Sequence, residues 1–566
     1  MFTRRWRKPL VLGLAVSMFV SSVFAQKTAR GTVQSSDLKT WLSYLASDEL
    51  EGRATFSEGL GLAAAYIAQQ LREMGVKPGG DNGSYFQRVK VLGVKTTQRS
   101  TLAVTVNGET RTFKDGAGLT FPKNVGGKRT VTVDQVEFVG YGLDAPTVNH
   151  NDYAGKNVAG KAVVYLGQGP KNLPQSMRRT LGSRARYATE QAKAVAVIGS
   201  AGGGFGGGGG RAGGGGGAGG GGGRGGQEQA DFTTVQRLDN PIAPNVTAND
   251  ELYEFLFSNA EVKYAELKDK AAKQDTLPTF TLKGVKLVFN LDADYQIVRT
   301  QLTRNVVGVI EGADPKLKDT YVLFSAHYDH VGYAEGEVVN GNRVGAPGRV
   351  QQGAVEDRIW NGADDDGSGS VTVLGVAKAF ATSPKPKRSL MFLWFAGEER
   401  GLWGSRYNAD YPLAPLANIV ADLNMDMVGR NRDDKASEDN SVYVVGSDRI
   451  STELHNINMA ANNALARPLK LDYEANDPTD PEGIYFRSDH YSYAAKGIPI
   501  VFYTTGLHPD YHFNTDSVDK INFEKMARIG QLVVETGRRV ANLDHAPARD
   551  NKGPRVGKGS DGKLAP

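Results

Sequence analysis

A short apolar run that ends in two histidines constrains the fold of this chain more than any other feature. Residues 321–332 have the sequence YVLFSAHYDHVG, in which an apolar stretch is followed at once by His327, Asp329 and His330. Such a run before a glycine predicts a buried β-strand with these polar residues at its carboxyl end. Open α/β sheets carry their binding sites at that end. The sequence therefore predicts an α/β fold with a polar site at the end of this strand.

Three acidic clusters follow, each near the end of an apolar run or the start of a helix. They are Asp364-Asp365-Asp366 in NGADDDGSGS, Glu398-Glu399 in SLMFLWFAGEERG and Asp426 in IVADLNMDMVG, and a further histidine, His512, lies in YHFNTDS. Carboxylates gathered in one cleft repel one another, so they require cations. Two histidines with several carboxylates suit two zinc ions that share a bridging group.

Strand-like and helical segments alternate from Asn305 onward. The strand-like runs are NVVGVIEG, YVLFSAH, SLMFLWFAG, IVADLNMDM, SVYVVGS and IPIVFYTTG, and helices are expected at about 369–382, 452–466 and 522–542. This alternation predicts a mainly parallel, mixed sheet that is covered by helices.

The amino terminus has the pattern of a signal peptide. Arg4, Arg5, Arg7 and Lys8 precede an apolar run from Pro9 to Val20, and Val23-Phe24-Ala25 forms a small-residue cleavage site before Gln26. We expect residues 1–25 to be removed and the protein to be exported, to the periplasm or outside the cell, without a stable membrane anchor. An uncleaved anchor is the alternative, although the apolar run is short for a span.

Charge and cysteine content exclude several classes of function. The formal net charge of +5 over 566 residues comes from scattered basic residues, so nucleic acid is not expected as a partner. The chain has no cysteine, which excludes disulfides and cysteine nucleophiles. An apolar content of 40% is enough for real cores.

The pattern along the chain predicts five parts. After the leader, residues 26–129 form an amino-terminal part of the main domain, and residues 130–285 form a separate β-rich module with a binding or lid role. Within that module, residues 202–226 are almost entirely glycine, which predicts a disordered loop. Residues 286–545 complete the main domain, and residues 546–566 form a flexible tail.

Six motifs, taken in this order, resemble metallopeptidase family 28, the di-zinc aminopeptidases that also include glutamate carboxypeptidases. They are SAHYDHVG, NGADDDGSG, FAGEERGLWGS, LNMDMVG, RSDHYSY and HPDYHFNTDSVDKI, and they cover roughly residues 306–523. Residues 130–285, with DYAGKNVAGKAVV, resemble the protease-associated domain that is often inserted in this family. The segment LASDELEGR resembles the family's amino-terminal part, which implies a peptidase domain split around the insert.

The resemblance implies a role for each site residue. His327 and Asp426 would bind one zinc ion, Glu399 and His512 the other, and Asp365 would bridge them. Glu398 would be the general base, and Asp329 would orient the ring of His327. Asp489, His490, Tyr503 and His508 would lie near the substrate. Asp364 and Asp366 would support the loop and bind no metal.

The leading hypothesis is an exported zinc aminopeptidase that acts on peptides with a free amino terminus. Three alternatives stay open at this point. They are a carboxypeptidase-like or dipeptidase activity, a non-catalytic binding protein on the same fold as in the transferrin-receptor branch, and a glutaminyl cyclase with one zinc ion.

Overall fold

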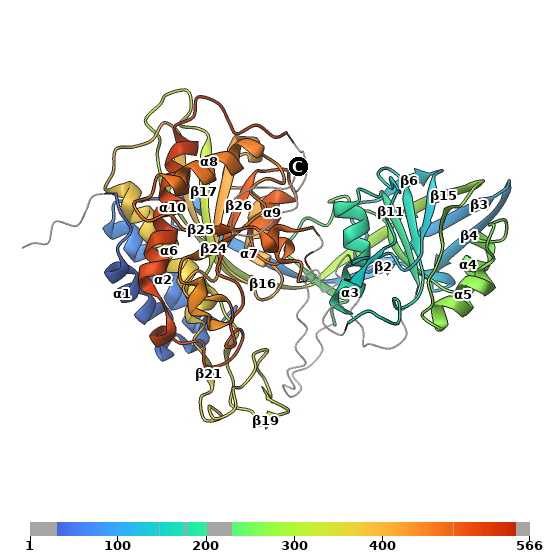
Figure 1. Ribbon diagram of the computed structural model, residues 1–566, viewed down its shortest axis with the longest axis horizontal. Helices are drawn as coiled ribbons and strands as arrows, with labels where there is room; N and C mark the ends of the chain where they lie inside the picture. The colour runs from blue at the N-terminus through green and yellow to red at the C-terminus, as the bar shows by residue number, and fades with distance from the viewer. Residues whose placement is uncertain are drawn as a thin grey trace, which may run out of the picture.

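The protein is built on two separate ten-stranded β-sheets, one for each domain (Figure 1). The computed structural model describes residues 31–145, 148–174, 178–200, 229–478, 480 and 482–550. The expected signal peptide and the glycine-rich run lie outside these residues, as does the tail beyond residue 550. None of the helices in the described ranges has the length and apolarity that crossing a membrane requires.

The larger domain is organised around the first sheet. Its strands lie in the order β12 (Phe232–Thr234), β2 (Phe86–Gln98), β16 (Ala293–Ile310), β22 (Ser389–Phe395), β17 (Tyr321–His327), β23 (Ile419–Met425), β26 (Ile500–Thr504), β24 (Ser441–Val445) and β25 (Lys470–Asp472), and β1 (Lys77–Pro78) pairs with β16. The four central strands, β22, β17, β23 and β26, are parallel, and most outer pairs are antiparallel. The expected mixed sheet with a parallel centre is therefore present.

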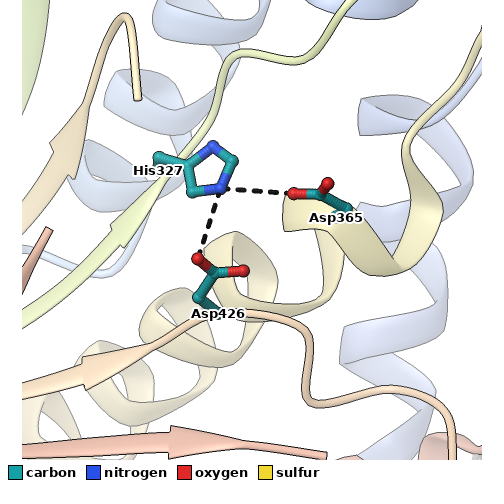
Figure 2. Close-up of side chains that lie close together, drawn as sticks. All are labelled: His327, Asp365 and Asp426. Carbon is teal, nitrogen blue, oxygen red and sulfur yellow. Dashed lines mark ion pairs between the residues drawn. The ribbon is translucent and has the colours of Figure 1, made fainter. Parts of the chain in front are cut away.

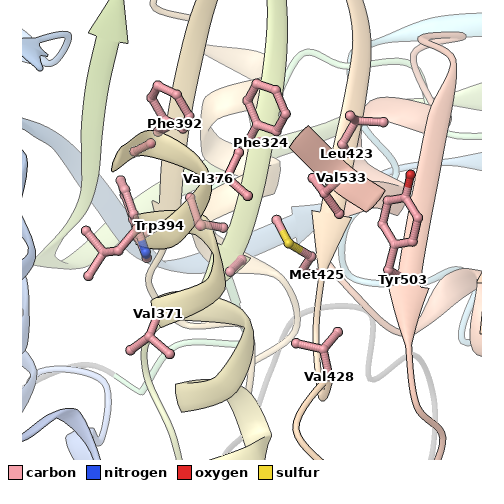
Figure 3. Close-up of a cluster of buried hydrophobic side chains, with 14 of the residues drawn as sticks. Phe324, Val371, Val376, Phe392, Trp394, Leu423, Met425, Val428, Tyr503 and Val533 are labelled. Carbon is pink, nitrogen blue, oxygen red and sulfur yellow. The ribbon is translucent and has the colours of Figure 1, made fainter. Parts of the chain in front are cut away.

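Continuous apolar sequence explains why the central strands lie in the middle. Every residue of β22 (SLMFLWF) and of β23 (IVADLNM) is buried, as parallel strands covered on both faces require. On one face, α6 (Gly369–Ala381) and α10 (Phe523–Ala541) cover them. Figure 3 shows Val371 and Val376 of α6 and Val533 of α10 against Phe324 and its neighbours.

Further helices complete the two layers beside this sheet. The first face also carries α1 (Ser35–Leu45), α2 (Glu58–Glu73) and α8 (Thr452–Asn463), whose apolar residues share the same core. On the other side, α9 (His490–Ala494) packs with residues of β22 and β26, and α7 (Trp403–Asp410) contacts α9. The helices expected at 369–382, 452–466 and 522–542 correspond to α6, α8 and α10.

The smaller domain is built on the second sheet. Its strands lie in the order β14 (Thr279–Thr281), β7 (Val136–Val139), β10 (Ala162–Tyr165), β11 (Ala196–Ser200), β13 (Asn245–Ala248), β5 (Gly118–Thr120), β4 (Glu109–Asp115), β3 (Thr101–Val106), β15 (Val285–Leu291) and β6 (Arg129–Val133). Its helices are α3 (Arg178–Arg186), α4 (Asp250–Leu256) and α5 (Tyr264–Ala272), and β8 (Asp144–Ala145) pairs with β9 (His150–Asn151).

This domain begins earlier in the chain than the expected boundary at residue 130. Strands β3, β4 and β5 precede that boundary but belong to the second sheet, because β3 pairs with β15 from Thr101↔Asn290 to Val106↔Val285. A pairing between segments so far apart leaves no local signal in the sequence. The second sheet therefore takes residues from 101 to 291.

Two long strands connect the domains. β2 and β16 pair from Phe86↔Val306 to Gln98↔Ala293, with an irregularity between Ile297 and Arg299. In Figure 1 this ribbon runs from the larger domain to the smaller one. Its middle is open to solvent, since Ile297 is 52% exposed and Leu302 54%.

A second projection leaves the larger domain between β17 and α6. We call residues 332–360 the arm. It contains two small antiparallel pairs, β18 (Gly332–Tyr333) with β21 (Ile359–Trp360) and β19 (Val338–Val339) with β20 (Asn342–Arg343). In Figure 1 the arm extends from the bottom of the larger domain.

Candidate metal centre

The polar residues expected at the strand ends meet at one edge of the first sheet. His327 is the last residue of β17, Asp426 follows β23, and Glu398 and Glu399 follow β22. These strands are parallel neighbours, so their carboxyl ends lie side by side. Asp365 joins them from the turn that leads into α6.

One group of ligand atoms forms around His327 (Figure 2). Its Nε2 atom lies 3.3 Å from Oδ1 of Asp365 and 3.6 Å from Oδ2 of Asp426. The ligand atoms of these three residues lie within 4.8 Å of one another. All three residues are buried.

A second group forms on the other side of Asp365. Nε2 of His512 lies 3.1 Å from Oδ2 of Asp365 and 3.2 Å from Oε2 of Glu399. Nδ1 of His330 lies 3.0 Å from Oε1 of Glu399, and His330, Asp365 and Glu399 also satisfy the geometry of a metal site. Asp365 thus offers one carboxylate oxygen to each group.

The donor atoms of both groups fit divalent cations. Within the described residues, five of these buried atoms have no hydrogen-bond partner, namely Nε2 of His327, both ring nitrogens of His330, Oδ2 of Asp365 and Oε1 of Glu399. Buried polar atoms are rarely left without a partner. Imidazole nitrogens and carboxylate oxygens that converge in this way are the ligands that zinc takes.

The electrostatics of the two acidic ligands favour their charged forms. Burial opposes ionisation of Glu399, but the charge of His512 outweighs it and holds the pKa of Glu399 at about 2. Burial also opposes ionisation of Asp365, and the neighbouring rings of His327 and His512 lower its pKa well below the usual range. Both carboxylates are therefore ready to bind cations.

Glu398 has the opposite character. Burial, together with the charges of Glu399 and Asp426, raises its pKa well above the usual range. Its Oε2 atom lies 3.9 Å from Nε2 of His327, and its side chain is 13% exposed. A carboxylate beside the ligand groups with a raised pKa is suited to accept a proton.

Asp329 supports the site, but not in the expected way. Nδ1 of His327 lies 3.1 Å from the backbone carbonyl of Asp329 and 3.7 Å from its Oδ1 atom. The carboxylate accepts the backbone N–H of Glu398 at 3.1 Å and the hydroxyl of Thr55 at 3.0 Å. Asp329 therefore orients His327 with its main chain and holds Glu398 with its side chain.

The turn that carries Asp365 is held by carboxylates on both sides. Asp516 accepts the backbone N–H groups of Asp364 at 2.9 Å and of Asp365 at 3.1 Å. Asp366 accepts N–H groups of Gly369 and Met427, and its peptide bond with Asp365 is cis. Asp364 accepts the N–H of Gly429, and neither Asp364 nor Asp366 belongs to a ligand group among the described residues.

A cavity of about 270 Å³ opens beside the two groups. Asp365, Glu398 and Asp426 form part of its wall. Four further acidic residues line it, namely Asp433, Glu474, Asp480 and Glu482, against two arginines, Arg432 and Arg487. Tyr511, which also lines the cavity, stacks on His512 with ring centroids 4.0 Å apart.

The four residues expected near the substrate do not line this cavity, namely Asp489, His490, Tyr503 and His508. All are buried behind it. His490 stacks on Phe502 with centroids 4.3 Å apart, and burial lowers its pKa to about 3. The hydroxyl of Tyr503 donates to Asn458, and His508 lies 3.4 Å from Asp364. Burial raises the pKa of Asp489 to about 7. These four side chains therefore lie in the interior and do not contact the cavity.

Comparison with known proteins agrees with the ligand geometry. Residues 305–537 match the model of Peptidase family M28. A probable leucine aminopeptidase of Arthroderma benhamiae is 31% identical to this chain over 182 residues, which are 31% of this chain and 46% of that protein. An aminopeptidase of Bacillus subtilis is 26% identical over 240 residues, 41% of this chain and 44% of that protein. The chain thus spans about half the length of the curated relatives that it matches.

Two solved structures of aminopeptidases are similar to a larger share of this chain. An aminopeptidase from an Aneurinibacillus strain matches with 19% identity and a TM-score of 0.41, over 92% of this chain and 98% of that one. A zinc aminopeptidase from Bacillus subtilis matches with 16% identity and a TM-score of 0.42, over 93% of this chain and all of that one.

Proposed function

We propose that the protein is a zinc-dependent aminopeptidase with two zinc ions in its M28 domain. The observation that carries this proposal is the position of Asp365 between two groups of buried ligand atoms. His327 and Asp426 would hold one ion, Glu399 and His512 the other, and Asp365 both. Zinc, when bound, supplies the Lewis acidity that polarises a carbonyl group and makes a water molecule more acidic.

Glu398 supplies the proton transfer in this proposal. Its carboxylate takes one proton from the attacking water as the new C–O bond forms. It then gives this proton to the leaving nitrogen as the C–N bond of the peptide breaks. Asp329 holds the backbone N–H of Glu398, so the base and His327 keep a fixed relation to each other.

The charges of the cavity support recognition of a substrate amino group. Both arginines in its wall already have acidic or phenolic partners. Arg487 lies 2.9 Å from Glu482 and donates to the hydroxyl of Tyr511, and Arg432 lies 3.1 Å from Glu474. A substrate carboxylate would have to compete with these pairs, whereas an ammonium group meets an excess of acidic residues. The names of the curated relatives favour the same class of substrate, peptides with a free amino terminus.

The test compares one peptide in three forms: unmodified, amino-acetylated and carboxy-amidated. Acetylation should abolish cleavage, because it removes the charge that the cavity would hold, and amidation should leave cleavage in place. The opposite pattern would contradict the aminopeptidase assignment and favour the carboxypeptidase alternative. Zinc content per chain distinguishes an aminopeptidase or a carboxypeptidase from a glutaminyl cyclase with one zinc ion.

We also propose that the protein is exported and that its smaller domain has a binding or lid role. The basic and apolar leader and the small-residue site at Val23-Phe24-Ala25 support export. Mass spectrometry of the protein secreted by its native host should find Gln26 as the first residue. An intact Met1 in the exported fraction would contradict cleavage.

A further inference from the structure

The arm pairs with the loop that carries His512. The backbone N–H of Arg349 donates to the carbonyl of His512 at 2.7 Å, and the N–H of Asn514 donates to the carbonyl of Arg349 at 3.2 Å. Arg349 and Phe513 form a parallel bridge, and the guanidinium of Arg349 lies 4.2 Å from the centre of the Phe513 ring. The arm and the His512 loop are therefore joined by main-chain hydrogen bonds on both sides of Phe513, the residue after the ligand.

One buried amide side chain completes this junction. Asn514 is 1% exposed, and its Oδ1 atom accepts the N–H of Gln351 at 3.0 Å. Its Nδ2 atom donates to the carbonyls of Ala354 at 2.7 Å and of Asp357 at 2.9 Å. Three backbone groups of the arm thus depend on a residue two positions after His512.

The inner part of the arm has a small core of its own. Trp360, which is fully buried, donates its indole N–H to the carbonyl of Arg349 at 2.9 Å. Trp360 shares a small apolar cluster with Val331, Ala334 and Val350. The outer part of the arm has little packing of its own, since Val339 is 53% exposed and Val344 61%.

His512 depends on such support more than the other ligands do. Its side chain is 28% exposed, whereas that of His327 is 1%, that of Asp365 4%, and those of Glu399 and Asp426 9% and 12%. Its backbone has φ +59°, a left-handed conformation that costs a non-glycine residue energy unless its surroundings hold it. Neither the body of a strand nor that of a helix supplies this residue.

We propose that the arm is a positioning element for His512, and that Asn514 is the residue through which it acts. The affinity of the Glu399 and His512 position for zinc then depends on the arm, whereas the affinity of the His327 and Asp426 position does not. This inference rests on the two-zinc site of the proposed function. It assigns a role to a segment that contributes no ligand itself.

The test measures zinc content and affinity for each ion, using the full-length protein and a competing chelator. Asn514→Ala leaves three backbone groups of the arm without a partner, so the ion at the Glu399 and His512 position should be lost at about 10- to 100-fold higher free zinc. The other ion should be retained with wild-type affinity. His512→Ala serves as the reference for loss of that position.

Two further variants keep the test decisive. Asn514→Asp has the same shape and keeps the acceptor for Gln351, but it loses the donor to the two carbonyls, so it should show the same selective loss. Val339 lies in the arm and is exposed, so Val339→Ala should bind both ions as the wild type does.

Two outcomes would overturn the proposal. Wild-type affinity for both ions in Asn514→Ala and Asn514→Asp would show that the arm does not position His512. Equal weakening of both ions, together with a lower melting temperature of the zinc-free protein, would show general destabilisation. A wild-type protein that binds two zinc ions but cleaves no peptide would contradict the proposed function alone, because the comparison of variants uses zinc binding.

Discussion

At the scale of single residues, the distances around Asp365 make different ligand variants distinguishable. Asp365 faces both ligand groups, whereas Asp426 and His512 each face one. Asp365→Ala should therefore lose both zinc ions, and Asp426→Ala and His512→Ala should each lose one. Elemental analysis of the purified variants measures this. Equal loss of both ions in all three variants would contradict the bridging role.

Glu398 tests the proton transfer separately from metal binding. Glu398→Gln keeps the size of the side chain and removes no proposed ligand, so both zinc ions should remain. Turnover should fall by about 10²- to 10⁴-fold, because the proton acceptor is lost. Steady-state kinetics and zinc content of the same sample give the result. A turnover close to that of the wild type would assign the base to another residue.

A buried carboxyl below the site gives a prediction for pH. Burial raises the pKa of Asp422 to about 7, and only the hydroxyl of Ser325 donates to it among the described side chains. Because its folded-state pKa lies above the unfolded value, its contribution to stability is present at low pH and is lost as pH rises through about 7. Asp422→Asn should remove this loss.

The measurement is denaturant unfolding of the zinc-free protein at pH 4 and at pH 8, in which the transition of the larger domain is followed. From pH 4 to pH 8, the free energy of unfolding of Asp422→Asn should rise relative to that of the wild type by up to about 4 kcal/mol. Zinc is left out because its own binding depends on pH. A constant difference between the two proteins across this range would contradict the raised pKa.

Three of the proposed ligands, His327, Glu399 and Asp426, could be placed together from the sequence because each follows an apolar run that the parallel sheet brings to one edge. Supporting contacts had no such signal. The backbone contact of Asp329, and the hold of Asp516 on Asp365, depend on loop geometry that residue type does not determine. Asp489 and His490 belong to the motif RSDHYSY, yet both are buried and neither lines the cavity.

At the scale of elements, helix spacing and apolar runs predicted α6, α8 and α10 to within a few residues. Short strands were harder to place, because their partners are distant in the chain. β3 was expected in the main domain, and its partner β15 lies at the other end of the smaller domain's sequence. Local pattern determines where a strand is, whereas sheet membership depends on pairing across the chain.

The contact of α10 with the sheet can be tested at Gly537, one of the two glycines of this helix. A Cβ atom at Gly537 would lie 2.4 Å from Cζ of Phe324, whose ring is stacked on Phe392 with centroids 5.3 Å apart. Gly537→Ala should therefore destabilise the larger domain by about 1–3 kcal/mol. Gly61→Ala in α2 is the matched control, because nothing lies within 4 Å of its Cβ position and alanine should add about 1 kcal/mol. Thermal unfolding should give shifts of opposite sign, and equal shifts would contradict the close contact.

At the scale of the whole molecule, the two domains have separate cores. The two largest apolar clusters belong to different sheets, and the ribbon of β2 and β16 between them is exposed in its middle. Outside the ribbon, the domains meet where Tyr491 contacts Glu190 and where Asp410 accepts from Arg237 and Asn240. Such an arrangement predicts two unfolding transitions.

Zinc should act on only one of these transitions. A ligand that binds only the folded state stabilises the unit that holds its site, by about 2.7 kcal/mol at a free concentration 100 times its Kd. All proposed ligands lie in the larger domain, so removal of zinc with a chelator should lower the transition temperature of that domain and leave that of the other unchanged.

Gly537→Ala should shift the same transition as the chelator does. Leu287→Ala, in the core of the second sheet, should shift only the other, by an amount that corresponds to about 2–5 kcal/mol. Differential scanning calorimetry of these samples decides the matter, because a single transition that moves as one with zinc and with both variants would mean that the domains unfold together.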